Sequence, residues 1–95
     1  SVLGPWMVTK DEIENPNELD LTISVNGKER QSSNANQLVY NVQKCIEYTT
    51  TRYTLYPGDI IMTGTPDGVG PVEPGDTMIA EIEKIGRMEV KVRAA

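Results

Sequence analysis

The sequence contains no histidine and no phenylalanine, and it has only one cysteine and one tryptophan among its 95 residues. The absence of histidine excludes Ser-His-Asp and Cys-His catalysis, imidazole proton transfer and His-containing zinc sites within these residues. The single cysteine, Cys45, excludes an internal disulfide and a Cys-rich metal site, and it favours a reducing compartment. Any chemistry must therefore use carboxylates, hydroxyls, lysine, tyrosine, backbone amides or groups from outside the chain.

A long apolar run and an excess of positive charge are also missing. No stretch approaches the roughly 20 apolar residues of a membrane span, and no signal-peptide pattern opens the chain. The chain has 9 Lys and Arg residues against 14 Asp and Glu residues, a net charge of -5. Neither nucleic acid nor a membrane is therefore an expected partner. We expect one small, soluble, cytoplasmic domain.

Alternating apolar residues predict a β-rich α+β fold. Every second residue from Leu19 to Val25 is apolar, which is the period of a half-buried strand. Asn26-Gly27 follows at once and favours a two-residue type I′ hairpin turn, because both residues accept a positive φ. The return strand over residues 28–33 is polar, so it is expected at a sheet edge. Further strands are predicted over residues 60–62, 77–85 and 88–92, with Gly86 as the break and two Pro-Gly-Asp turns.

One amphipathic helix is predicted over about residues 38–51, with Asn36 or Asn41 as its N-cap. Its apolar stripe consists of Leu38, Val42, Cys45 and Ile46. The apolar stripe predicts that the helix covers the sheet as a lid. Within the stripe, Cys45 is interpreted as a buried, inert thiol, because no base accompanies it.

The segment from Thr63 to Gly70 is the candidate for ligand binding. It holds three glycines and two threonines directly after a predicted strand, so backbone N–H groups and hydroxyls can approach one anion closely. The alternative is a wide turn between two strands. The spacing matches neither the dinucleotide-binding pattern G-x-G-x-x-G nor a phosphate loop.

Two other features have simpler interpretations. Glu81 and Glu83 have the spacing to chelate a hard cation from one strand face, but acidic residues that alternate with apolar ones are typical of a solvated face. Trp6 follows Gly4-Pro5 and is interpreted as a core or interface anchor.

Several stretches of the chain resemble the fumarylacetoacetate hydrolase family. They are Leu3–Ile13, Val25–Gly27 with Arg30–Asn34, and Pro57–Gly70, with Pro74-Gly75-Asp76 before a strand. The most specific of them is the Thr-Gly-Thr-Pro-x-Gly-Val-Gly motif, and together they cover almost all of the chain in the family's order. Residues 1–95 therefore resemble the C-terminal part of that family's mixed β catalytic domain.

The resemblance implies a divalent-metal enzyme that acts on 2-oxo or 1,3-dicarbonyl acids. Such enzymes hydrolyse acylpyruvates, decarboxylate oxaloacetate, or isomerise and decarboxylate intermediates of aromatic catabolism. The metal, Mg²⁺ or Mn²⁺, is implied to chelate the 2-oxo acid group and to stabilise an enolate. A homodimer is the implied assembly.

The resemblance also implies that the metal-binding and catalytic residues lie upstream of this chain. The family's Glu-x-Glu pair, its later Asp, its His-Glu lid and its substrate-facing Lys all precede the Gly-Pro-Trp segment. No catalytic or metal-binding residue is therefore assigned here, and Glu81 and Glu83 are not that pair. The implied substrate-binding residues are Thr63, Gly64, Thr65 and Pro66, and either threonine hydroxyl is a candidate to contact the substrate.

Two hypotheses follow about the chain as a whole. In the first, it supplies the substrate loop and part of a dimer or association surface, and the 95 residues alone are inactive. In the second, it is a catalytically inactive module that binds a small ligand or a protein and keeps part of the family fold.

Overall fold

A β-hairpin begins the sheet in the computed structural model, which describes all residues from 1 to 95. Strand β1 (Asp20–Val25) turns at Asn26 and Gly27 into β2 (Lys28–Asn34). Both turn residues have positive φ, 51° and 80°, as the predicted type I′ turn requires. Strands β3 (Thr77–Ile82) and β4 (Gly86–Lys91) form a second hairpin. All neighbours are antiparallel in the order β2-β1-β3-β4, so the polar strand β2 does lie at an edge.

One face of this sheet is apolar because the strand pairing aligns apolar residues row by row. Leu21 lies opposite Ile82, and Val25 lies opposite Met78 on β3. Met78 in turn lies opposite Val90 on β4. Partners in an antiparallel pair project to the same side, so the predicted alternation of β1 is confirmed.

A β-bulge interrupts the pairing of the two edge strands. Ser24 pairs with Glu29 and Ile23 pairs with Gln31, so Arg30 is an extra residue on β2. A bulge bends its strand and changes the direction of nearby side chains. The bulge could not be predicted from the sequence, because β2 is polar throughout and has no alternation of apolar and polar residues whose shift would mark the extra residue.

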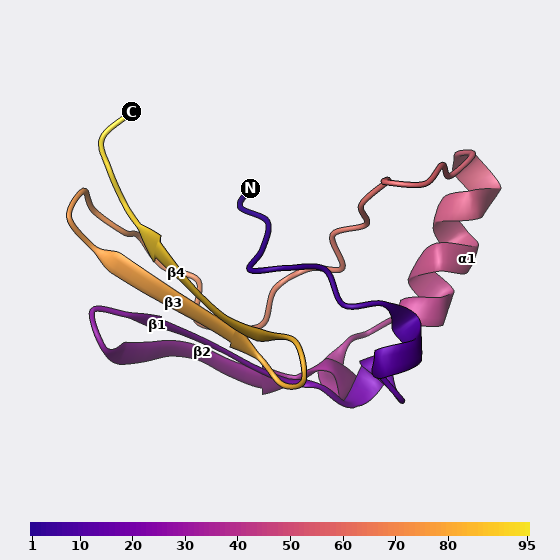
Figure 1. Cartoon of the computed structure of the whole chain (residues 1–95), viewed down its shortest axis with the longest axis horizontal. Coiled ribbons are helices and arrows are strands. Elements are labelled where there is room, and N and C mark those ends of the chain that lie inside the picture. The colour runs from indigo at the N-terminus through magenta and orange to yellow at the C-terminus, as the bar shows by residue number, and fades with distance from the viewer.

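The helix α1 (Val42–Arg52) differs from the prediction in both its start and its position. Asn41 is the N-cap, since its side chain accepts a hydrogen bond from the Lys44 N–H at 2.9 Å, so residues 38–41 precede the helix. The helix stands at the end of the sheet and does not cover its face (Figure 1). The predicted lid is therefore wrong. Short 3₁₀ helices at Lys10–Glu12, Pro16–Glu18 and Ala35–Gln37 connect the remaining segments.

Two further strand predictions need correction. Residues 60–62 form no strand, because the chain from Tyr53 to Asp76 finds no strand neighbour, and Ile60 and Met62 are largely exposed. The predicted strand over residues 77–85 ends at Ile82. A turn over residues 83–85 follows, with Lys84 at a φ of 62°, and Gly86 begins the next strand instead of breaking it.

Irregular segments cover the apolar face in place of a helix. At the β4 side, Trp6 lies against Gly86 and Gly4 lies against the Met88 sulfur. At the β2 side, the segment after Thr65 is held by Arg30, whose guanidinium donates to the Pro71 carbonyl oxygen at 3.2 Å. Gly68 lies so close to β2 that a Cβ there would overlap the Arg30 carbonyl oxygen.

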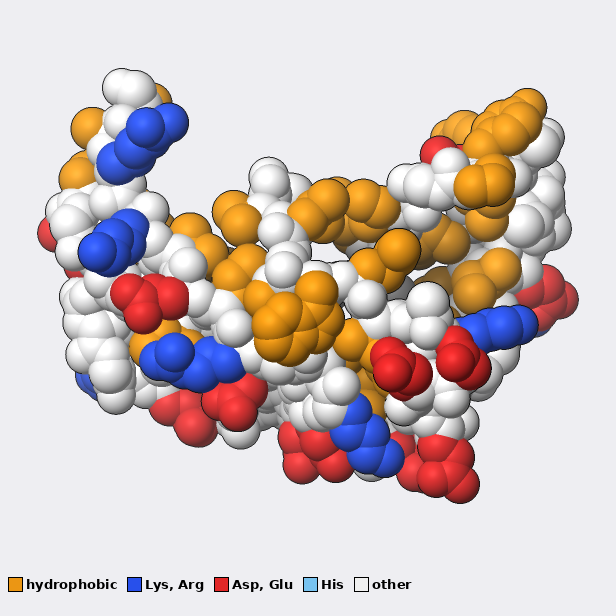
Figure 2. All heavy atoms as spheres, viewed as in Figure 1, with side chains coloured by type: hydrophobic (Ala, Val, Ile, Leu, Met, Phe, Trp, Pro, Cys, Tyr) orange, Lys and Arg blue, Asp and Glu red, His pale blue; other side chains and the backbone are white.

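Most of the chain is nevertheless accessible to solvent. Only Leu19, Val25 and Gln31 are buried, and the accessible surface is 7733 Å². A folded monomer of 10.5 kDa exposes about 5,400 Å². Hydrophobic side chains gather along the concave side between the sheet and α1 (Figure 2). None of the helices combines the length and apolar character needed to cross a bilayer.

Replacing Gly68 by alanine is expected to destabilise the protein more than replacing Gly58. Both glycines have positive φ, 103° and 96°. Only Gly68 has a backbone neighbour within reach of a new Cβ. Overpacking of that kind costs about 1–3 kcal/mol beyond the shared backbone strain. Thermal unfolding of Gly68→Ala and Gly58→Ala checks this; equal losses of Tm would contradict the close contact.

Asp76 is expected to make stability pH-dependent in the acid range. The backbone N–H of Glu73 and the side-chain amide of Asn26 donate to its carboxylate, and these hydrogen bonds lower the pKa of Asp76. Because the folded pKa is depressed, the stabilisation is present above the unfolded pKa of about 3.9 and is lost as the pH falls through the folded value. Tm measured from pH 6 to pH 2.5 should fall less steeply for Asp76→Asn, whereas the exposed control Asp67→Asn should follow the unmodified protein.

Candidate functional site

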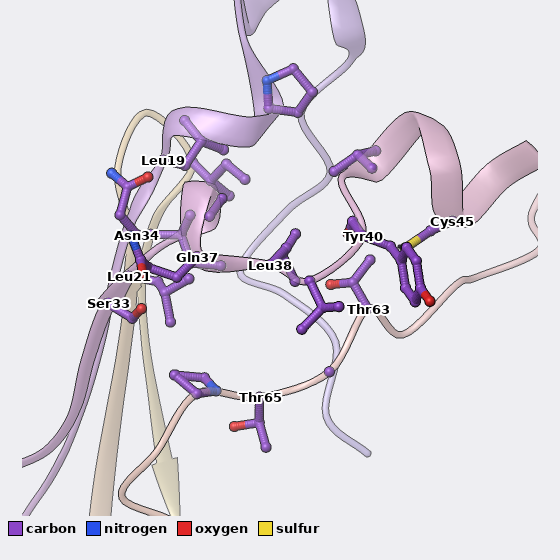
Figure 3. Close-up of a pocket in the computed structure, with 18 residues that line it drawn as sticks. Leu19, Leu21, Ser33, Asn34, Gln37, Leu38, Tyr40, Cys45, Thr63 and Thr65 are labelled. Atoms are coloured by element: carbon purple, nitrogen blue, oxygen red, sulfur yellow. Dashed lines mark hydrogen bonds between the residues drawn. The ribbon is translucent and has the colours of Figure 1, made fainter.

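A cavity of about 430 Å³ opens where the apolar face of the sheet meets the start of α1 (Figure 3). Leu19, Leu21 and Ile82 form its wall on the sheet side. The segment from Leu38 to Tyr40, with Val42 and Cys45, forms the wall on the helix side. The size is within the range of small-molecule sites, which are mostly apolar with a few directed polar groups.

The predicted ligand loop forms the remaining wall of this cavity. Thr63, Gly64, Thr65 and Pro66 all line it. Thr63, Gly64 and Thr65 are exposed, and Pro66 is half-buried. The structure thus brings the four residues to one cavity, and whether they bind a substrate stays a prediction.

Gly64 presents open backbone to the cavity. Its φ is 111°, a conformation that side-chain-bearing residues rarely adopt, and no atom lies within 4 Å of where a Cβ would stand. A ligand can therefore approach the main chain between the two threonines without meeting a side chain.

The two threonine hydroxyls differ in their surroundings. The Thr63 side chain points across the cavity toward Leu38 (Figure 3), and its hydroxyl has no hydrogen-bond partner in the chain. The Thr65 Oγ1 accepts a hydrogen bond from Gln31 Nε2 at 2.8 Å. The same nitrogen donates to the Pro66 carbonyl oxygen at 2.6 Å. The position of Thr65 is therefore fixed from β2, while Thr63 is free to meet a ligand.

Gln31 is the residue at this site that the sequence did not reveal. It is only 7% exposed, although it belongs to a polar edge strand. It pairs with Ile23 on β1, which places it on the apolar face of the sheet. A single buried glutamine in a polar strand leaves no pattern in the sequence. The only available signal was its place in the Arg30–Asn34 stretch.

The cavity is uncharged. Its polar groups are hydroxyls, side-chain amides and one thiol, and no Asp, Glu, Lys or Arg lines it. A bound anion would therefore rely on hydrogen-bond donors from this chain, and any charge that neutralises it must come from elsewhere.

The acidic residues of the chain do not form a metal centre. No three His, Cys, Asp or Glu side chains lie together in an arrangement that could hold a metal ion. Glu83 lies beyond β3, where its carboxylate accepts a hydrogen bond from the Asp20 N–H at 3.1 Å, while Glu81 is within the strand. The two residues therefore do not share one strand face as a chelating pair.

The structure also shows where Cys45 and Trp6 lie. Cys45 is half-buried in the cavity wall, and its Sγ lies 3.6 Å from the Tyr40 carbonyl oxygen. Its thiol is thus less buried than predicted, because the helix does not pack on the sheet. Trp6 is 63% exposed despite its contact with Gly86, which leaves most of the ring available as an interface anchor.

Comparisons with known proteins place this geometry in context. The chain is 51% identical over 94 residues to a maleylpyruvate hydrolase of Aquipseudomonas alcaligenes, covering 99% of this chain and 33% of that protein. It is 46% identical over 97 residues to the mitochondrial oxaloacetate tautomerase FAHD2A of Bos taurus, covering 95% of this chain and 31% of that protein. The chain thus spans about a third of the length of these relatives.

A solved structure shows the same fold. The crystal structure of maleylpyruvate hydrolase from Sphingobium sp. SYK-6, in complex with manganese(II) and pyruvate, matches with a TM-score of 0.93 and 43% identity. The match covers 95% of this chain and 34% of that one. In addition, residues 1–93 match the family model described as fumarylacetoacetate (FAA) hydrolase C-terminal. The chain therefore belongs to the fumarylacetoacetate hydrolase family and corresponds to the C-terminal part of its fold.

Proposed function

We propose that the chain is the substrate-holding part of a divalent-metal enzyme that hydrolyses acylpyruvates. The observation that carries the proposal is the uncharged, donor-bearing cavity beside Thr63 and Thr65, in a fold whose relative binds manganese and pyruvate. A 2-oxo acid has a carboxylate and an oxo group that need hydrogen-bond donors, and a carbon chain that needs a pocket. The cavity offers both.

Within this proposal the chain's own residues bind and orient the substrate. The hydroxyls of Thr63 and Thr65 donate to the carboxylate or oxo oxygen, and Gly64 lets the main chain approach it. The apolar wall of Leu19, Leu21 and Leu38 excludes water from the acyl part.

The metal belongs to another part of the protein in this proposal. This chain's side chains do not fit a metal site, and its cavity contains no carboxylate. Carboxylates upstream of this chain are proposed to hold Mg²⁺ or Mn²⁺. Such an ion supplies positive charge that stabilises negative charge developing on a 2-oxo acid.

A second reaction, tautomerisation of oxaloacetate, shares the same substrate chemistry. It is favoured by the 46% identity to an oxaloacetate tautomerase. Oxaloacetate and maleylpyruvate each carry a second carboxylate, and this cavity has no cation for either, so its lining does not separate the two substrates. The higher identity to a maleylpyruvate hydrolase, 51% against 46%, favours the acylpyruvate. Two assays distinguish these reactions: one measures the release of pyruvate from maleylpyruvate, and the other measures enol–keto exchange of oxaloacetate.

The concave apolar surface is proposed to receive the metal-binding part of the same protein. Val39 is 90% exposed, Met7 89% and Met62 79%. The accessible surface exceeds that of a typical monomer by about 2,300 Å². A standard interface buries about 800 Å² per partner, so the surplus is enough for an obligate association.

Replacing Thr65 by valine is expected to weaken pyruvate binding to the intact, Mn²⁺-loaded protein. A hydrogen bond to a charged group contributes about 1.5–3 kcal/mol, so the Kd should rise about 10- to 150-fold. Thr63→Val tests the other hydroxyl, and Thr54→Val is a control outside the cavity. Calorimetric titration measures all three. If the Kd is unchanged in both Thr63→Val and Thr65→Val, the loop is not part of the pyruvate-binding site.

The isolated 95 residues are expected to be inactive and to expose their apolar surface. They should bind a hydrophobic dye strongly and release no pyruvate from maleylpyruvate with added Mn²⁺, whereas the intact protein should bind little dye and turn over. Dye fluorescence and a pyruvate-release assay compare the two. Turnover by the isolated chain would refute the division of roles. A compact, inactive monomer with sharp cooperative unfolding would favour a binding module, and a stable dimer of the isolated chain would assign the surface to a second copy.

A further inference from the structure

The bulge on β2 brings two consecutive side chains to the same loop. Successive residues of a regular strand project to opposite faces. Arg30 nevertheless donates to the Pro71 carbonyl oxygen, and Gln31 donates to Thr65 and Pro66. The register shift at Arg30 is the local feature that permits this, because a bulge breaks the alternation.

The contacts of Gln31 determine which way its amide faces. The carbonyl oxygen of Pro66 can only accept a hydrogen bond, so the amide group within 2.6 Å of it must be the nitrogen. The same nitrogen is 2.8 Å from the Thr65 Oγ1. Its two N–H bonds are therefore divided between the two acceptors, and the amide cannot flip without facing two oxygens.

This arrangement also determines how the Thr65 hydroxyl interacts. Its oxygen already accepts a hydrogen from Gln31. A hydroxyl has one proton to donate, and that proton cannot return to a nitrogen that is itself donating. The Thr65 O–H is therefore directed to a partner other than Gln31, and the cavity lies beside it.

We propose that Gln31 is a positioning residue that sets Thr65 as a hydrogen-bond donor to the substrate's carboxylate, with the Arg30 bulge holding the loop in place. The inference rests on the proposed function. It goes further because it assigns a role to a side chain that does not line the cavity. Burial supports the role: Gln31 is 7% exposed, so water does not compete readily for its two hydrogen bonds.

The test is a double-mutant cycle on pyruvate binding to the intact, Mn²⁺-loaded protein. Gln31→Met keeps the length of the side chain and removes the donor, and it should raise the Kd for pyruvate about 10-fold. In a Thr65→Val background the same change should raise the Kd less than twofold, because no hydroxyl remains to be oriented. Mn²⁺ affinity should not change. Gln43→Met, an exposed glutamine on α1 outside the cavity, is the matched control.

A second variant covers the case in which Gln31→Met fails to fold. Gln31→Asn keeps an uncharged amide, but its side chain is one methylene shorter, so its nitrogen cannot reach Thr65 and Pro66 together. It should raise the Kd about as much as Gln31→Met does, again only when Thr65 is present.

The outcomes separate this inference from the function on which it rests. Equal effects of the Gln31 variants in the two backgrounds, or no effect in either, overturn the positioning role while the pyruvate site stands. Failure of the unmodified intact protein to bind pyruvate with Mn²⁺ overturns the proposed function, and the positioning role with it.

Discussion

The apolar face of the sheet is the constraint on which the rest of this structure depends. A sheet that is hydrophobic on one side must be covered, and helices or a second sheet usually provide the cover. Here the cover comes from the segment around Trp6 and from the segment after Thr65, neither of which has regular secondary structure. Because irregular backbone has few partners of its own, side chains from the sheet must hold it. Arg30 and Gln31 do this on the β2 side.

The same constraint explains which parts of the fold could be predicted. The strands from Leu21 and from Thr77 follow a two-residue period, and the turn at Asn26-Gly27 follows from backbone conformation, so local chemistry was sufficient for them. The run at Ile60 has the composition of a strand but has no neighbour to pair with. Strand formation depends on a partner as well as on propensity, and no sequence pattern supplied one.

The candidate site divides in a similar way. The four residues from Thr63 to Pro66 were identifiable because glycines and hydroxyls in one short segment are unusual next to an apolar run. The helix was expected over the sheet, but the cavity owes one wall to the helix standing beside it (Figure 3). Gln31 was not identifiable, because its burial results from tertiary packing of a loop that is far away in the sequence.

The bulge at Arg30 has a consequence for how this hairpin tolerates a change in length. Lys28 pairs with Val25 beside the turn, and Gln31 pairs with Ile23 beyond the bulge. A chain lacking Arg30 would keep both pairs in an unbroken ladder, with the same residues facing the apolar side. Hairpin geometry therefore does not require the extra residue. What a deletion would remove is the carbonyl against which Gly68 lies and the guanidinium that reaches Pro71. The extra residue Arg30 therefore lies in strand β2, but the structure that depends on it is the loop that contains Gly68 and Pro71.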